Sequence, residues 1–93
     1  MYLHLGQSFV VHQKDILGIF DLDNTSSSFR TRKFLEKAER EGRVITATDD
    51  LPKSFVLCQG KDGRSVVYLS QLSSATLRGR AENNSFVRDF EWK

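Results

Sequence analysis

Residues 28–42 read Ser-Phe-Arg-Thr-Arg-Lys-Phe-Leu-Glu-Lys-Ala-Glu-Arg-Glu-Gly, and this stretch decides the fold class. Its apolar positions follow the i, i+3, i+4, i+7 spacing of one helix face and are Thr31, Phe34, Leu35 and Ala38. The polar residues 23–28 are rich in side chains that cap helix N-termini, and Gly42 suits the left-handed conformation that ends a helix. The stretch predicts an amphipathic helix from about Ser28 to Glu41.

The segments on either side of this helix have β character. The expected strands are residues 2–5, 8–12 and 16–22 before the helix, and residues 43–48, 55–59 and 65–69 after it. Residues 16–22 are almost continuously apolar, as expected of a buried central strand, and Gly18 indicates a bend or a close backbone approach. Asp62-Gly63 between the last two strands predicts a hairpin.

A short second helix is expected after the hairpin, with Ser73 or Ser74 as its N-cap. The fold class is therefore α+β: a small β-rich domain with short N-terminal strands, one central amphipathic helix, a C-terminal hairpin and a short second helix. The 93 residues suit one domain. We expect that domain over residues 1–80, and residues 81–93 form a tail of unknown role.

Composition limits the classes of protein that fit. A hydrophobic content of 39% and a charged content of 28% are typical of a globular chain and exclude wholesale disorder. Cys58 is the single cysteine, so no intrachain disulfide can form. Neither a signal peptide nor an apolar run of about 20 residues is present. These features predict a cytoplasmic protein without a membrane partner.

Motifs for catalysis, metals and cofactors are weak. His4 and His12 fall in separate strands, which favours ordinary strand histidines over a metal site. Cys58 lies in an apolar strand, where a buried, inert thiol is expected. Residues 60–63 lack the length and the following helix of a phosphate-binding loop. The sequence therefore predicts a protein that is not an enzyme and has no metal or cofactor.

Carboxylates occur in two pairs that have simple interpretations. Asp21 and Asp23 resemble a catalytic pair, but with Asn24 next they are more typical of a helix entry turn. Asp49 and Asp50 are expected to be solvated loop charges.

One feature of the sequence points to a function, and it is the distribution of charge on the central helix. Four cations fall within about a quarter-turn, beside the apolar face, and we call them the cationic stripe: Arg30, Lys33, Lys37 and Arg40. Such a stripe can contact phosphates and release counterions. The alternative is a solvated face with some cations paired to Glu36 or Glu41, which is what charge runs on helices usually are.

Three stretches together resemble the Rem family of bacterial extracellular matrix (biofilm) regulators, and its RemB-like branch in particular. They are Met1-Tyr2-Leu3-His4-Leu5-Gly6, Thr31-Arg32-Lys33-Phe34-Leu35-Glu36 and Tyr68-Leu69-Ser70-Gln71-Leu72-Ser73-Ser74-Ala75-Thr76-Leu77. The resemblance covers about residues 1–80. It implies a non-enzymatic regulator of matrix gene expression, with a related activator branch that is oligomeric and binds DNA.

This sequence departs from the activator branch at two places where the resemblance implies arginines. The loop of residues 49–53 carries Asp49 and Asp50 and keeps only Lys53 as a cation, and Asp15 stands before the third strand. DNA contact would then depend on a candidate set made of the cationic stripe together with Lys53, Arg78 and Arg80.

Two function classes stay open. One is a homo-oligomeric regulator that binds duplex DNA. The other is a protein–protein regulatory module that does not bind DNA itself, whose partner is a paralogous regulator.

Overall fold

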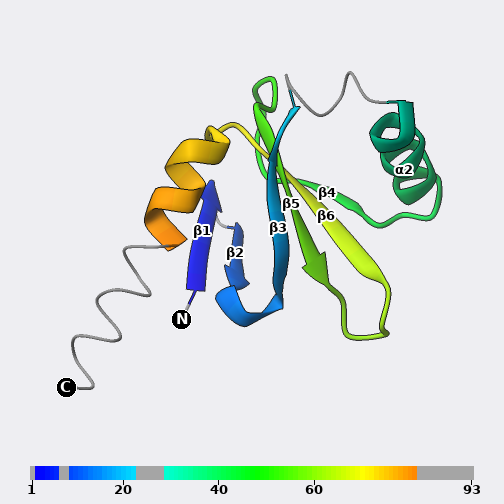
Figure 1. Cartoon of the computed structure of the whole chain (residues 1–93), viewed down its shortest axis with the longest axis horizontal. Helices are drawn as coiled ribbons and strands as arrows, with labels where there is room; N and C mark the ends of the chain where they lie inside the picture. Colours follow the sequence, from blue (N-terminus) through cyan, green and yellow to red (C-terminus); the bar gives the residue numbers. More distant parts are fainter. Residues whose placement is uncertain (1, 7–8, 23–28, 82–93) are drawn as a thin grey trace.

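The computed structural model describes residues 2–6, 9–22 and 29–81 and contains two sheets (Figure 1). The elements in chain order are β1 (Tyr2–Gly6), β2 (Phe9–His12), the 3-10 turn η1 (Gln13–Asp15), β3 (Ile16–Asp21), α2 (Phe29–Arg40), β4 (Val44–Thr46), β5 (Ser54–Gln59) and β6 (Ser65–Ser70). A further helix, called here the terminal helix, covers residues 74–81. The expected α+β class is confirmed.

The larger sheet has the strand order β3-β5-β6-β4. The pairs β3–β5 and β5–β6 are antiparallel, whereas β4 runs parallel to β6. The predicted hairpin is confirmed as β5–β6: the Gly60 N–H donates to the Arg64 carbonyl at 2.8 Å, and Gly63 has a φ of +85°. The smaller sheet pairs β1 with β2 in antiparallel register.

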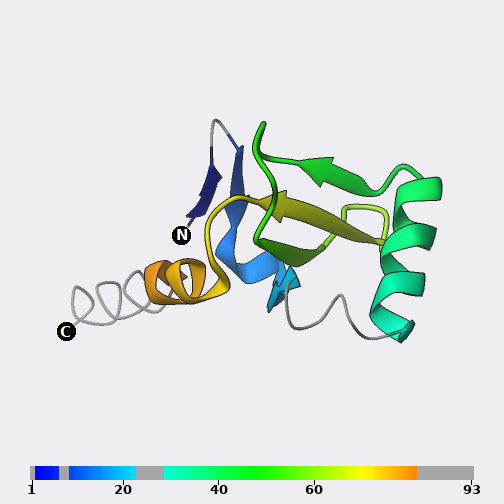
Figure 2. The same ribbon diagram turned by 90° about the horizontal axis from the view of Figure 1, so that it is seen from above.

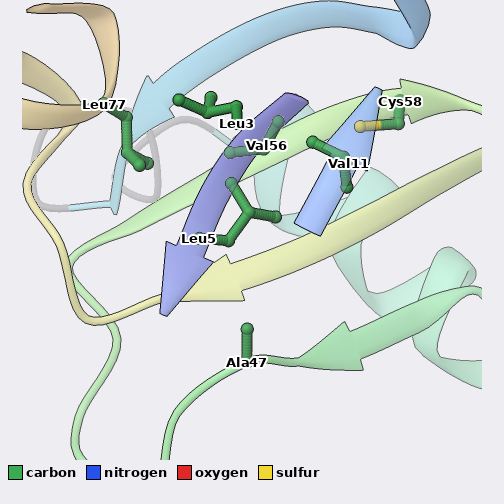
Figure 3. Packing of buried hydrophobic residues seen from close by; sticks show 7 residues of the cluster. All are labelled: Leu3, Leu5, Val11, Ala47, Val56, Cys58 and Leu77. Carbon is green, nitrogen blue, oxygen red and sulfur yellow. The ribbon is translucent and has the colours of Figure 1, made fainter. Parts of the chain in front are cut away.

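These elements form three layers, with the larger sheet in the middle (Figure 2). The β1–β2 hairpin and the terminal helix cover one face of that sheet, and α2 covers the other. The first core cluster joins the larger sheet to the hairpin and the terminal helix (Figure 3); its buried members are Leu3, Leu5, Val11, Ala47, Val56, Cys58 and Leu77. The second core cluster joins the sheet to α2, and its buried members are Ala38, Phe55 and Val67.

The prediction of residues 16–22 as a central strand was wrong, because β3 is an edge strand of the larger sheet. Its apolar run has another cause. Ile16 and Ile19 pack against the first core cluster, while Phe20 and Leu22 pack against the second. A strand covered on both faces reads as apolar throughout, wherever it lies in the sheet.

The bend expected at Gly18 is a β-bulge. Ile16 pairs with Cys58 and Gly18 with Leu57, so Leu17 is the extra residue of the strand. Gly18 also permits a close approach, since a Cβ added there would lie 2.6 Å from the Phe20 ring. The bend expected at Gly18 is therefore confirmed, and the group that approaches Gly18 closely is a side chain, not the backbone of another segment.

The end of α2 at Gly42 is confirmed in detail. Gly42 has a φ of +72°, its N–H donates to the Glu39 carbonyl at 3.1 Å, and the Arg43 N–H donates to the Ala38 carbonyl at 2.8 Å. These two bonds form a Schellman motif, which satisfies carbonyls that the helix end leaves without partners. The residues expected to cap the N-terminus of α2, 23–28, lie outside the described residues.

We expect Gly42→Ala to destabilise the protein by about 1–2 kcal/mol. An added Cβ would meet nothing within 4 Å, so the cost is that of the left-handed backbone alone. The measurement is urea unfolding followed by circular dichroism. Gly79→Ala is the matched control: Gly79 lies inside the terminal helix and a Cβ there also meets nothing, so this change should stabilise by about 0.5–1 kcal/mol. Equal shifts for the two variants would contradict the prediction.

Ser73 is the N-cap of the terminal helix, as one of the two predicted alternatives. Its Oγ accepts a hydrogen bond from the Thr76 N–H at 3.1 Å, which is the N-cap to N3 bond of a capped helix.

Two buried serines of the larger sheet form hydrogen bonds with neighbouring segments. The Ser70 hydroxyl donates to the Leu5 carbonyl, and the Ser54 hydroxyl donates to the Leu72 carbonyl at 2.7 Å.

Candidate nucleic-acid interface

All four side chains of the cationic stripe are exposed to solvent. α2 turns its apolar side chains toward the second core cluster, with Ala38 fully buried and Phe34 and Leu35 packed against it. This packing fixes the rotation of the helix about its axis, and the stripe lies beside the buried face. At 1.5 Å per residue, the stripe extends over about 15 Å of helix.

The carboxylates near the end of α2 form no ion pair with the stripe in the described ranges. In the described ranges, ion pairs join Arg43 to Glu41 at 2.6 Å and Arg64 to Asp62 at 3.1 Å, and neither involves the stripe. The hydrogen bond from Arg43 lowers the pKa of Glu41, so this carboxylate is ionised and turned toward Arg43. Within the described residues no stripe cation forms an ion pair with Glu36 or Glu41. The charge of Lys37 nevertheless adds to the lowering of the Glu41 pKa, after the larger effect of Arg43.

Arg43 holds its place through three different partners. Besides Glu41, its guanidinium donates to the backbone carbonyl and to the hydroxyl of Ser65, both at 2.8 Å. The Cζ atom of Arg43 also lies 6.0 Å from the centre of the Phe34 ring. Arg43 therefore links the end of α2 to the start of β6 and has a structural role.

Phe29 belongs to this surface and was missed from the sequence. Its side chain is 64% exposed, and the Lys33 ammonium lies 5.2 Å from the centre of its ring, within the range of a cation–π contact. A helical wheel carries the signal that could have found it, because Phe29 falls outside the apolar face and beside Lys33 and Arg40. The candidate interface is thus the cationic stripe plus Phe29.

The remaining cations of the candidate set lie elsewhere. Arg78 and Arg80 are exposed on the terminal helix, at the opposite end of the molecule from α2 (Figures 1 and 2). The Arg78 guanidinium donates to the Ile19 carbonyl at 2.6 Å, which fastens the terminal helix to β3. Lys53 is exposed just before β5. A single chain therefore brings the stripe together but does not join it to Arg78 and Arg80.

The loop before β5 presents a different surface. Asp49, Asp50 and Leu51 are all exposed, and Leu51 is 88% exposed. Thr48 shapes this loop, because its hydroxyl donates to Gln71 at 2.7 Å and accepts from the Asp50 N–H at 2.9 Å. The loop is held in a form that displays an apolar side chain next to two acids, and the interpretation of Asp49 and Asp50 as solvated charges is confirmed.

The structure shows where the histidines and aspartates considered for catalysis or metal binding lie. His4 is exposed on β1, and the His12 ring lies 4.5 Å from the ring of Tyr2. Within the described ranges, no group of three or more His, Cys, Asp or Glu side chains is placed to hold a metal. Asp21 ends β3, and Asp23 lies outside the described residues.

Cys58 is buried in the first core cluster and is not in a disulfide, as expected. Burial, with a smaller effect of Asp15, raises its pKa from an ordinary 9.0 to about 11.

At pH 8 the native thiol should react with a disulfide reagent roughly 100-fold more slowly than the thiol of the urea-unfolded chain, because only the thiolate reacts. The rate of the native protein should then rise with pH toward about 11. Rapid stoichiometric labelling of the native protein at pH 8 would contradict this.

No helix within the described residues combines the length and the apolar character needed to cross a bilayer.

The fold and the site define a class: a small three-layer α+β domain that displays a cationic helix face to solvent. The family model described as RemA-like, extracellular matrix regulatory protein A-like, matches residues 2–81. Extracellular matrix regulatory protein B of Bacillus subtilis (strain 168) is 39% identical to the chain over 82 residues, which cover 88% of this chain and 91% of that protein. The chain therefore belongs to the RemA-like family, and the resemblance drawn from the three sequence motifs is confirmed.

Proposed function

We propose that this protein is a non-enzymatic regulator of extracellular matrix (biofilm) gene expression that acts in the cytoplasm as a homo-oligomer bound to duplex DNA. The names of the family and of the Bacillus subtilis relative support the regulatory role and describe no enzyme. In this proposal residues 1–80 form the regulatory domain, and residues 81–93 are a C-terminal tail of unknown role.

The observation that carries DNA binding is the cationic stripe. Its four side chains are exposed, and no carboxylate in the described ranges lies within salt-bridge distance of them. A B-DNA major groove, about 12 Å wide, admits an α-helix, and cations along one helix flank reach the phosphates that border it. Phe29 adds an exposed aromatic ring beside the cations, suited to apolar contact with sugars or thymine methyl groups.

Oligomer formation supplies what one chain lacks. Arg78 and Arg80 lie far from α2 within a chain (Figure 1), so they join the DNA-binding surface only as parts of neighbouring copies. β3 and β4 are the edges of the larger sheet, and sheet edges are surfaces that other copies can pair with or cover.

A salt titration on a fluorescent duplex tests the proposal. If the four cations of the stripe each contact a phosphate, the logarithm of the association constant should fall against the logarithm of salt concentration with a slope of roughly −3.6, about −0.9 for each contact. Mass measurement with and without the duplex, at two salt concentrations, reports the oligomer. Absence of binding to any duplex at low salt would reject DNA contact, and a monomeric mass would reject self-association.

A protein–protein regulatory module is the second candidate, and the loop before β5 favours it. Leu51 is 88% exposed and follows Asp49 and Asp50, an arrangement suited to a partner with an apolar pocket bordered by cations. The partner in this case is a paralogous regulator. Leu51→Ser should then abolish capture of the paralogue while leaving the salt-dependent binding of DNA unchanged. If the variant still captures the paralogue, the loop is not the partner-binding surface.

A further inference from the structure

A cavity of about 300 Å³ lies between α2 and the larger sheet. This volume is at the lower end of the range for small-molecule sites, roughly 300–1,000 Å³. The residues that line it come from β3, α2 and β5, and are Phe20, Arg30, Thr31, Phe34, Phe55 and Leu57.

The apolar wall of the cavity is built by the fold. The rings of Phe20 and Phe55 stack at 4.9 Å between centroids with 23° between their planes. Phe20 can take this position because Gly18 has no side chain; a Cβ there would lie 2.6 Å from the ring. The rings are thus held in place without a ligand, which lowers the ordering cost of binding.

The polar side of the cavity is contributed by α2. Among the described lining residues Arg30 is the one that is ionisable, and Thr31 adds a hydroxyl. No carboxylate in the described part of the chain forms an ion pair with Arg30. Among the described residues, the lining is therefore apolar with one cation that forms no ion pair, and such a lining selects a ligand with an apolar body and one anionic end.

We propose that this cavity binds an organic monocarboxylate with an unbranched apolar body, such as a medium-chain fatty acid. The chain of the ligand lies against Phe20, Phe55 and Leu57, and its carboxylate accepts hydrogen bonds from the Arg30 guanidinium. The pairing of a guanidinium with a carboxylate is strong and directional, which gives the site its preference for an acid over an alcohol or an amine of the same length.

The site has a regulatory consequence, and this part rests on the proposed function. Arg30 belongs both to the cavity and to the cationic stripe. A bound carboxylate neutralises one of the four charges offered to DNA, so the ligand and the duplex oppose each other. Linkage requires the effect to be reciprocal: DNA must weaken binding of the acid by the same factor.

The test is an NMR titration of the ¹⁵N-labelled full chain with octanoate. Saturable shifts are expected at the amides around Phe20, Thr31, Phe34 and Leu57, and octylamine and acetate should produce none. Arg30→Gln should weaken octanoate binding about ten-fold or more. Lys37→Gln is the matched control, because Lys37 lies two turns along the same stripe and does not line the cavity; its affinity for octanoate should be unchanged.

The outcomes separate this proposal from the proposed function. Absence of saturable shifts, equal binding of octylamine, or equal losses in Arg30→Gln and Lys37→Gln would each overturn the cavity site. The titration contains no DNA, so its result for the cavity site remains valid even if the protein fails to bind a duplex. In a separate arm, octanoate should weaken duplex binding several-fold in the wild type and not in Arg30→Gln; no effect on the wild type would overturn the coupling alone.

Discussion

Replacing Leu5 by Ala should lower the free energy of unfolding by about 3–4 kcal/mol. Leu5 is fully buried in the first core cluster, at the contact between β1 and the larger sheet. Removing a buried leucine side chain costs about 2–5 kcal/mol, because the burial of the removed atoms is lost and a cavity remains. A domain of this size has a total stability of about 5–14 kcal/mol, so the change removes a large part of it.

The measurement is equilibrium unfolding in urea followed by circular dichroism. Leu51→Ala is the matched control, since it makes the same chemical change at a side chain that is 88% exposed and should alter stability by no more than about 0.5 kcal/mol. Similar unfolding midpoints for the two variants would show that β1 does not pack on the sheet as described.

Removing the charge of the cationic stripe should have the largest effect on DNA binding. Arg30→Gln, Lys33→Gln, Lys37→Gln and Arg40→Gln combined should reduce affinity for duplex DNA by roughly 10²–10³-fold at moderate salt, because each lost phosphate contact costs several-fold. Gln has a helix propensity close to those of Lys and Arg, and all four sites are exposed. The variant should therefore fold normally.

A second variant with the same change in net charge is the control for this experiment. It replaces four exposed cations outside the stripe by Gln: Lys14, Arg32, Lys61 and Arg64. If the stripe is the contact surface, this control should lose much less affinity and keep the salt dependence of the wild type. Equal losses in both variants would mean that net charge alone attracts the duplex, and the stripe would lose its assignment.

The local elements were predictable because each has a short-range signal. The apolar spacing from Thr31 to Ala38 and the stop at Gly42 define α2, and Asp62-Gly63 defines the β5–β6 hairpin. The position of β3 in the sheet had no such signal. Partial cover of both faces of β3 comes from the hairpin on one side and α2 on the other, and only the tertiary fold specifies that arrangement.

The candidate site was predictable to a similar extent. Helical geometry alone places the cationic stripe on one flank of α2, and its exposure follows from the burial of Phe34, Leu35 and Ala38. The distance from the stripe to Arg78 depends on the sheet between them, which no spacing in the sequence reveals. The cavity was equally hidden, because Phe20, Arg30 and Phe55 come from three separate elements.

The two core clusters lie on opposite faces of one sheet, and this separation affects how such proteins can diverge. The outward-facing flank of α2 contributes to neither cluster, because the helix packs against the second cluster through its opposite, inward-facing side. Proteins encoded by a duplicated gene can therefore reverse the charge of the side chains on this flank and still fold. A switch from polyanion binding to partner capture between paralogues would then require only a few surface codons to change.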